Sequence, residues 1–470
     1  MEHRRVWITT ADGTRLAARL WLPDERPAAV VLEALPYRMD DLTASYASEY
    51  ERLCQEGGLA VCRLDIRGTG SSEGIATDEY TREEHADICD AIAWLAEQEW
   101  SNGRVGMYGT SWSGFNSIQV ACERPPALHA IAPIYATDDR YTDDVHYMGG
   151  ALKAVDLVDW ELYMVACNLL PPVPAVFGRG WRDEWLHRIE NTEPWLLRWL
   201  EEQVDGPYWR HGSLRPGYER IACPTMIVAG WADGYRNNTF RTFEALHCPK
   251  RLLIGPWSHM SQATSLPGPH IDLVPELVRW FGRWLRDDPN GIDTEPPIAV
   301  FARRSTRPAP ALAEMKGEWR AESEWPPARL ETSVLRPAGE GTVVIHVRGD
   351  VLDLRAGTSR SPLARRLRLA EHLAAACRRH DARRTALGRA GAPGARRAER
   401  SRPAGTPADD RFGHACGTGR RRPAPARVAL RARPRRQRDS RRHLVRLALR
   451  LGVRGQGRRA LRRRCRRLHR

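Results

Sequence analysis

Residues 105–117, Val-Gly-Met-Tyr-Gly-Thr-Ser-Trp-Ser-Gly-Phe-Asn-Ser, contain a serine placed for nucleophilic chemistry. An apolar strand is predicted before Ser111 and a helix after it, so this serine lies on a tight turn between the two. Such a turn holds its serine in a strained backbone conformation that exposes the hydroxyl. Strand and helix nearly touch there, and the residues two positions away on either side, Gly109 and Ser113, are small enough to permit this.

The neighbouring residues favour Ser111 over the other serine of the turn. A turn centred on Ser113 would place Phe115 where a small residue is needed. The literal G-x-S-x-G pattern is missed by one position, because the second glycine is Gly114. A serine nucleophile also needs a histidine base and an acid that orients it, so these partners must be sought later in the chain.

Two buried strands are predicted at 225–230 and 251–255, and each is followed by a candidate partner. Asp233 follows the first strand and His259 follows the second. Taken singly, an Asp-Gly pair is typical of a turn, and a histidine is often a packing or capping residue. Their order behind the serine, each just past a strand end, favours a catalytic triad of Ser111, Asp233 and His259.

Five segments resemble the CocE/NonD family of α/β-hydrolases, which comprises cocaine-esterase-like proteins, X-prolyl dipeptidyl-peptidases and α-amino-acid ester hydrolases. The resemblance extends over about residues 1–345 and implies that Ser111 is the nucleophile, His259 the general base and Asp233 the residue that orients it. The segments are Leu-Pro-Tyr-Arg-Met-Asp at 35–40, Asp-Ile-Arg-Gly-Thr-Gly-Ser-Ser-Glu-Gly at 65–74, Gly-Thr-Ser-Trp-Ser-Gly at 109–114, Ala-Gly-Trp-Ala-Asp-Gly at 229–234 and Gly-Pro-Trp-Ser-His at 255–259.

The resemblance also implies an oxyanion hole formed by the Trp112 backbone N–H and the phenol of Tyr37. Most related hydrolases use two backbone amides, but a phenol is a good donor, and one well-aimed donor is worth about 2.7–4 kcal/mol in the transition state. The implied substrate is a small ester or amide, namely an acyl ester, an α-amino-acid ester or an X-Pro dipeptide. The mechanism calls for no cofactor and no metal.

The resemblance predicts an α/β-hydrolase fold with an inserted helical cap and the start of a C-terminal jelly-roll β-sandwich. Strands are also predicted at 298–301, 330–335 and 342–347, and the first of these would open the sandwich. The expected parts are a first hydrolase segment at 1–139, the cap at 140–218, a second hydrolase segment at 219–290, a truncated sandwich at 291–348 and an Arg-rich segment at 349–470.

The expected cap region holds two groups of residues that could contact substrate. Six tryptophans on helical stretches are typical of packing, although one or two could line an acyl or leaving-group pocket. Four aspartates near the start of the cap could receive a substrate ammonium, or they could form a solvated loop with helix N-caps. The tryptophans are Trp160, Trp181, Trp185, Trp195, Trp199 and Trp209, and the aspartates are Asp138, Asp139, Asp143 and Asp144.

The net charge of +15 averages two unlike parts. Residues 346–470 carry 38 Arg, no Lys and 8 acidic residues, a net charge of +30, which leaves −15 for residues 1–345. The basic part could be a disordered tail that binds nucleic acid through phosphate contacts, or a basic helical domain. Out-of-frame translation of GC-rich DNA is the favoured interpretation, because selection for positive charge would also use Lys. A nucleic-acid-binding function is therefore disfavoured, and loss of the sandwich makes a catalytically impaired scaffold the main alternative.

Other sequence features point to a cytoplasmic enzyme. No segment reaches the roughly 18 apolar residues that span a bilayer, and the first residues lack the apolar centre of a signal peptide. The ten cysteines have neither metal-site spacing nor the pairing typical of a disulfide framework.

Overall fold

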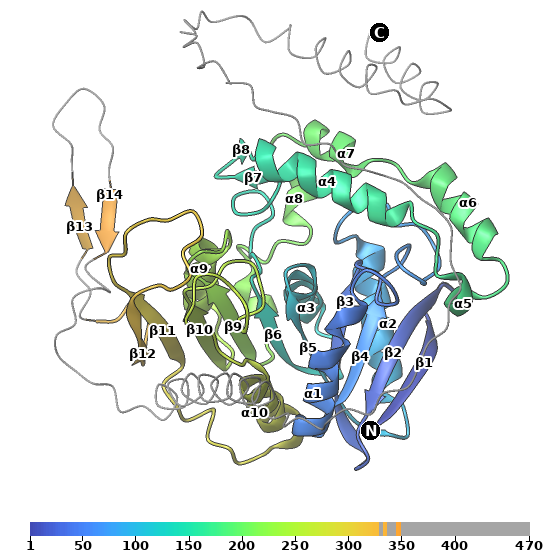
Figure 1. Cartoon of the computed structure of the whole chain (residues 1–470), viewed down its shortest axis with the longest axis horizontal. Helices are drawn as coiled ribbons and strands as arrows, with labels where there is room; N and C mark the ends of the chain where they lie inside the picture. The colour runs from blue at the N-terminus through green and yellow to red at the C-terminus, as the bar shows by residue number, and fades with distance from the viewer. Residues whose placement is uncertain (329–331, 336–344, 349–470) are drawn as a thin grey trace, which may run out of the picture. The chain divides into compact units, whose positions relative to one another are not determined.

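The computed structural model describes residues 1–328, 332–335 and 345–348. Ten strands form one mixed sheet in the order β1-β2-β4-β3-β5-β6-β9-β10-β11-β12 (Figure 1). The strands from β4 to β11 run parallel, and β3, β4 and β9 are buried throughout, as expected for parallel strands covered on both faces. Their bounds are β1 (Glu2–Thr9), β2 (Arg15–Leu22), β3 (Ala28–Leu35), β4 (Ala60–Asp65), β5 (Ser101–Thr110), β6 (Leu128–Ile134), β9 (Thr225–Gly230), β10 (Lys250–Gly255), β11 (Ile298–Arg303) and β12 (Gly317–Glu322).

The helices that pack on the sheet include two contacting pairs. Helix α1 (Ala47–Gly57) contacts α10 (Val274–Arg286), and α2 (Arg82–Ala96) contacts α3 (Trp112–Glu123). A further helix, α9 (Arg236–Ala245), follows β9. In the part of the chain that the structure describes, no helix combines the length and the apolar character needed to cross a bilayer.

The chain leaves the sheet after β6 and returns at β9, and the segment between them carries five α-helices, α4 to α8 (Figure 1). Three tryptophans of this cap, Trp195, Trp199 and Trp209, are each at most 2% exposed and belong to the same buried cluster as the side chains of the sheet. Packing, rather than substrate contact, therefore accounts for these three side chains. The cap elements are β7 (Tyr147–Met148), β8 (Ala151–Leu152), α4 (Ala154–Asn168), α5 (Pro174–Phe177), α6 (Trp181–Asn191), α7 (Trp195–Glu201) and α8 (Pro207–Arg210).

The sheet extends further along the chain than the sequence analysis predicted. Strand β11 was expected to open a separate sandwich, but it pairs in parallel with β10, with Leu252 opposite Ile298. Strand β12 then pairs antiparallel with β11. The prediction of a domain boundary near residue 290 is wrong in this respect, because the apolar β11 completes the open edge of β10 rather than a new sheet.

A short antiparallel hairpin follows, formed by β13 (Thr332–Leu335) and β14 (Ile345–Arg348). It falls on the two later segments that were predicted as strands. The remainder of the predicted sandwich and the Arg-rich segment lie outside the described residues, so both stay predictions.

Candidate active site

Ser111 occupies a turn between β5 and α3 that only small neighbours permit. Its φ of 62° and ψ of −118° lie outside the regions that ordinary residues favour. A Cβ added at Gly109 would lie 1.7 Å from the Ser113 Oγ, and one at Gly114 would lie 2.9 Å from two carbonyl oxygens. The requirement for small residues around the predicted nucleophile is therefore steric.

The turn is fixed from both sides by neighbouring strands. The Ser111 N–H donates to the Ile134 carbonyl on β6 over 2.9 Å. The Ser113 hydroxyl donates to Glu33 Oε1 on β3 over 3.0 Å, and the Tyr50 hydroxyl donates to the other carboxylate oxygen of Glu33. The backbone strain at Ser111 is thus held by buried hydrogen bonds.

Asp233 and His259 are brought together by the loops that follow β9 and β10. The Trp231 N–H donates to the carbonyl of Gly255 at the end of β10 over 2.9 Å. The Ala232 N–H donates to the Trp257 carbonyl over 3.0 Å, which joins the two loops. Asp233 Oδ2 lies 2.6 Å from His259 Nδ1, and Asp233 Oδ1 accepts the Tyr235 N–H over 2.7 Å. A carboxylate at Nδ1 requires the proton there, so the neutral ring presents Nε2 as an acceptor.

Ser111 and His259 line one cavity of about 260 Å³. The Asp233 side chain is 1% exposed, whereas the His259 side chain is 42% exposed. The imidazole is therefore accessible on one side and held by a buried carboxylate on the other. A serine hydroxyl, an imidazole acceptor and a buried acid are the three groups needed for nucleophilic acyl transfer.

Tyr37 and Trp112 lie beside each other, and Trp112 directly follows Ser111, but neither is among the residues that line the cavity with Ser111 and His259. Their rings are edge-on with centroids 6.4 Å apart. Trp112 is the first residue of α3, and the N–H groups of a first helical turn have no partner within the helix. Burial raises the pKa of the Tyr37 phenol well above its usual range, so this hydroxyl remains a proton donor.

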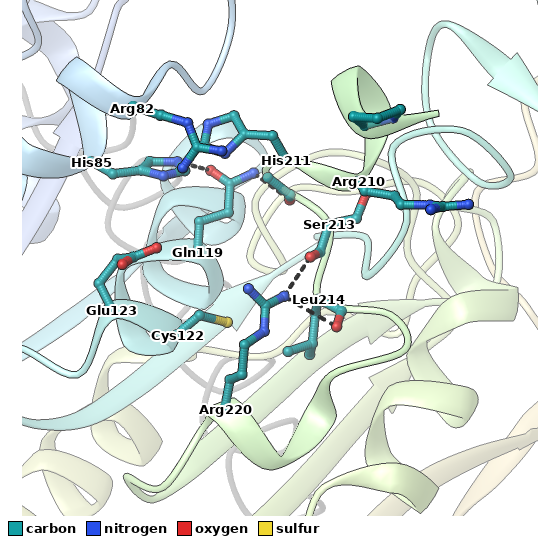
Figure 2. Close-up of a pocket in the computed structure, with 12 residues that line it drawn as sticks. Arg82, His85, Gln119, Cys122, Glu123, Arg210, His211, Ser213, Leu214 and Arg220 are labelled. Carbon is teal, nitrogen blue, oxygen red and sulfur yellow. Dashed lines mark hydrogen bonds between the residues drawn. The ribbon is translucent and has the colours of Figure 1, made fainter. Parts of the chain in front are cut away.

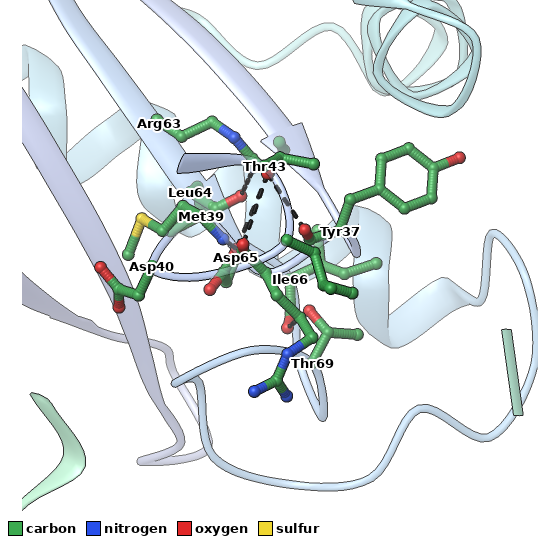
Figure 3. A network of polar contacts seen from close by, with 12 residues as sticks. Tyr37, Met39, Asp40, Thr43, Arg63, Leu64, Asp65, Ile66 and Thr69 are labelled. Carbon is green, nitrogen blue, oxygen red and sulfur yellow. Dashed lines mark hydrogen bonds and ion pairs between the residues drawn. The ribbon is translucent and has the colours of Figure 1, made fainter. Parts of the chain in front are cut away.

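A polar network at the ends of β3 and β4 fixes the backbone around Tyr37 (Figure 3). The Thr43 hydroxyl donates to the Tyr37 carbonyl over 3.0 Å and accepts a weak bond from Arg63 over 3.4 Å. The Asp65 carboxylate accepts the Met39 N–H over 2.9 Å, and burial raises its pKa to about 6. These contacts tie the segment after β3 to the end of β4 and leave the Tyr37 ring directed away from the network.

Among the four cap aspartates, only Asp144 lines the cavity with Ser111. Asp138 and Asp143 both pair with Arg241, and Asp139 pairs with Arg215 over 3.1 Å. The expectation of a solvated loop is therefore wrong, because ion pairs and burial account for three of the four. Asp144 is 1% exposed, and burial raises its pKa to about 6.

Two residues that line the cavity, Glu79 and Tyr80, come from the segment before α2 and carry no signal in the sequence. Trp160, one of the six cap tryptophans that could have lined a substrate pocket, also lines it. The Trp160 indole donates to Glu79, so this tryptophan both packs within the cap and lines the cavity. A Thr-x-x-Glu capping box at 81–84 was a readable signal for the start of α2, but it gives no information on what the preceding residues face.

A second cavity of about 360 Å³ lies between α2, α3 and the loop that follows α8 (Figure 2). Gln119 spans it by accepting a hydrogen bond from His85 over 2.9 Å and donating to the Gly212 carbonyl over 2.8 Å. Its lining is mostly polar and includes Arg82 and Arg220, but none of the predicted triad. The larger of these two cavities is thus separate from the candidate chemistry.

Several known proteins are similar to this chain. Cocaine esterase from Rhodococcus sp. (strain MB1 Bresler) is 28% identical over 361 residues, which cover 68% of this chain and 59% of the esterase. A putative Xaa-Pro dipeptidyl-peptidase from Streptomyces avermitilis is 24% identical and is aligned over 62% of this chain and 41% of its own length. The chain thus spans about three fifths or less of these relatives.

Solved structures show the same fold. A CocE/NonD family hydrolase from Staphylococcus aureus superposes with a TM-score of 0.57 at 19% identity, covering 71% of this chain and 58% of that chain. The sequence profile of the X-Pro dipeptidyl-peptidase (S15) family matches residues 12–261, which is more than half of the chain. The strained serine turn, the joined Asp233 and His259 loops and this match agree, and the chain belongs to the X-Pro dipeptidyl-peptidase (S15) family of α/β-hydrolases.

Proposed function

We propose that this protein is a serine hydrolase that cleaves an ester or amide through an acyl-enzyme on Ser111. The contact between Asp233 Oδ2 and His259 Nδ1, beside the cavity shared with Ser111, carries the proposal. A hydrolase activity agrees with the family and with the names of the relatives. The acyl-enzyme and the roles of single residues go beyond that agreement.

The first half of the reaction forms the acyl-enzyme. His259 Nε2 takes the proton of the Ser111 hydroxyl as Oγ attacks the substrate carbonyl, and Asp233 stabilises the imidazolium that results. The Tyr37 phenol and the Trp112 N–H donate to the developing oxyanion. The tetrahedral intermediate then collapses, and the imidazolium protonates the alcohol or amine that leaves.

The second half returns the enzyme to its starting state. Water gives a proton to His259 and attacks the acyl carbon, and the same two donors stabilise the second oxyanion. Ser111 leaves with the proton held by the imidazolium, which releases a carboxylic acid. Each step uses water, side chains of the described residues and the Trp112 backbone N–H.

We further propose that the substrate carries an ammonium group near its scissile bond. Asp144 and Glu79 place two buried carboxyl groups in the cavity, beside the aromatic rings of Tyr80 and Trp160. Arg140 lies near both carboxyl groups, but the pKa of Asp144 is about 6 and that of Glu79 about 8, so Asp144 is the one that carries its charge at neutral pH and is the stronger partner for a cation. An α-amino-acid ester or an X-Pro dipeptide would supply such a group.

The nucleophile is tested by labelling with a fluorophosphonate. Ser111→Ala should abolish both the covalent label and ester hydrolysis, because the proposed mechanism uses no other nucleophile. Ser48→Ala, a change at an exposed serine of α1, is the matched control and should label like the wild type. Undiminished labelling of the Ser111→Ala protein would refute the assignment.

A further inference from the structure

Glu84 places a carboxylate behind the serine turn, at a position that the proposed mechanism does not use. It lies in the first turn of α2 and is 4% exposed. Its Oε1 accepts the Trp112 indole N–H over 2.7 Å, and its Oε2 accepts the Tyr80 backbone N–H over 2.9 Å. Both oxygens are thus used as acceptors, and Asn116 supplies a further side-chain hydrogen bond. The bonds from Trp112 and Tyr80 lead to residues beside the active site.

This carboxylate is costly to bury. None of the ion pairs found among residues 1–328 includes Glu84, and burial raises its pKa to about 7. An ionised carboxylate without a cation loses its hydration and regains only what its hydrogen bonds supply. The bond from the Tyr80 N–H belongs to the start of α2, as in a capping box, whereas the bond from the Trp112 indole reaches a different helix and is not explained by helix capping.

Tyr80 is one of the two residues that Glu84 holds. Its φ of 53° is positive, a conformation that costs a non-glycine residue about 1–3 kcal/mol. Its ring packs on Trp112 and Phe115 with centroids 4.8 and 5.5 Å away, and it lines the cavity with Ser111. The hydrogen bond from the Tyr80 N–H to Glu84 therefore fixes a strained part of the substrate wall.

Trp112 is the other residue. It directly follows Ser111, and its backbone N–H is the proposed oxyanion donor. The indole is 1% exposed and is anchored at its far end by Glu84, so the first turn of α3 cannot rotate without breaking that bond. Oxyanion donors lose their effect when they are misaimed by a fraction of an ångström to an ångström.

We propose that Glu84 is a positioning residue that aims the Trp112 N–H at the oxyanion and holds the Tyr80 wall in place. This inference rests on the proposed function, since it assigns Glu84 a role only through the oxyanion donor. Glu84 touches neither the substrate nor the reacting atoms. It contributes by fixing the positions of Trp112 and Tyr80, which contact the substrate in the proposed mechanism.

Glu84→Gln tests the inference with almost no change of shape. Glutamine replaces one acceptor oxygen by an NH₂ group, which cannot accept from either Trp112 or Tyr80. We expect kcat for each titrated active site to fall by about 10- to 100-fold, with a smaller change in KM. Glu83→Gln removes the same charge from the neighbouring, exposed position of α2 and should retain wild-type kcat.

Trp112→Phe tests the same bond from its other end and does not depend on Glu84→Gln folding. It removes the indole N–H and keeps the backbone N–H, so kcat should again fall. In the double variant, the effect of Glu84→Gln should shrink, because both changes remove one interaction. Thermal melting separates these changes from loss of the folded state.

Two results would overturn the inference. One is a folded Glu84→Gln protein with wild-type kcat, and the other is a wild-type kcat in Trp112→Phe. Strictly additive effects would also refute it, since they would mean that Glu84 does not act through the indole. The Ser111→Ala labelling result distinguishes these outcomes from failure of the proposed function. If that label is lost while Glu84→Gln stays fully active, only the positioning role fails.

Discussion

The proposed triad depends on the hydrogen bond between Asp233 and His259. The sequence predicted this pair only from the order of serine, acid and histidine along the chain. Strand ends at 230 and 255 predicted that Asp233 and His259 would meet, since neighbouring parallel strands place their following loops together. The 2.6 Å contact between them follows from that rule. Glu79 and Glu84 could not be predicted as neighbours of the active site, because no local pattern shows whether a residue near the start of a helix faces the cavity, the core or solvent.

Asp233→Asn should lower kcat by about 10³- to 10⁴-fold while leaving the protein folded. An amide nitrogen facing His259 Nδ1 would favour the tautomer with the proton on Nε2, and that ring cannot accept the Ser111 proton. Steady-state hydrolysis of an activated ester checks this. Asp272→Asn, at a carboxylate that pairs with Arg52, is the control. A loss below about tenfold would contradict the proposed role of Asp233.

Asp144→Asn should reduce kcat/KM for an α-amino-acid ester and spare the matched ester that lacks the amino group. Asp144 is buried in the cavity, so its charge acts on a substrate cation at a low effective dielectric. We expect a loss of about 10- to 100-fold for the amino ester alone. Equal losses for both esters would contradict recognition of an ammonium.

The preference for the amino ester should also depend on pH. Burial raises the pKa of Asp144 to about 6 and that of Glu79 to about 8, so below pH 6 both groups are neutral and attract no cation. As the pH rises through 6, Asp144 gains its charge and the ratio of the two kcat/KM values should increase. It should fall again once the substrate amine, with a pKa near 8, loses its proton. The ratio cancels any pH effect that is common to both substrates. Asp144→Asn should remove the increase near pH 6.

At the scale of elements, local patterns predicted strands better than their partners. The segments at 225–230 and 251–255 are strands β9 and β10 almost as expected. Segment 298–303 is also a strand, but its pairing with β10 was not foreseen. An apolar run predicts that a strand is buried. Which strand it pairs with depends on contacts with residues far away in the sequence. The need for small residues around Ser111 was predictable, because it follows from steric contacts between residues that are close in the sequence.

Gly109→Ala should destabilise the protein both by backbone strain and by steric overlap of the added Cβ with its neighbours. The added Cβ would lie 1.7 Å from Ser113 Oγ and 2.5 Å from Glu33 Oε1, in a backbone with φ of 147°. Gly103→Ala is the matched control, since Gly103 lies on the same strand with positive φ and open space around it. We expect the free energy of unfolding to fall by about 1–3 kcal/mol more for Gly109→Ala than for the control, together with a loss of kcat. Urea unfolding and active-site titration measure these changes. Equal effects of Gly109→Ala and Gly103→Ala would show that the turn can accommodate the added methyl group.

At the scale of the whole chain, every residue of the proposed mechanism precedes position 260. The sheet continues to β12, and the Arg-rich segment that follows differs in composition from everything before it. Residues 1–345 carry a net charge of −15 and residues 346–470 carry +30. Sequencing the coding DNA across codons 340–360 tests the frameshift interpretation. A single-base insertion or deletion that restores alternating strand patterns would support it, and an intact frame would contradict it.

Deleting residues 349–470 should leave the hydrolase chemistry in place. The residues that line the cavity with Ser111 and His259 lie between positions 79 and 259, and the last strand of the ten-stranded sheet is β12. The deletion therefore removes no group that the mechanism uses. We expect kcat/KM for each titrated site to stay within about twofold of the full chain, and the isoelectric point to shift from 9.7 to below neutrality. Ester hydrolysis and isoelectric focusing of both proteins check this. Salt-dependent DNA binding that disappears on deletion would instead support a nucleic-acid-binding tail. Loss of both labelling and cooperative melting would show that the deleted residues stabilise the hydrolase fold, which contradicts the prediction.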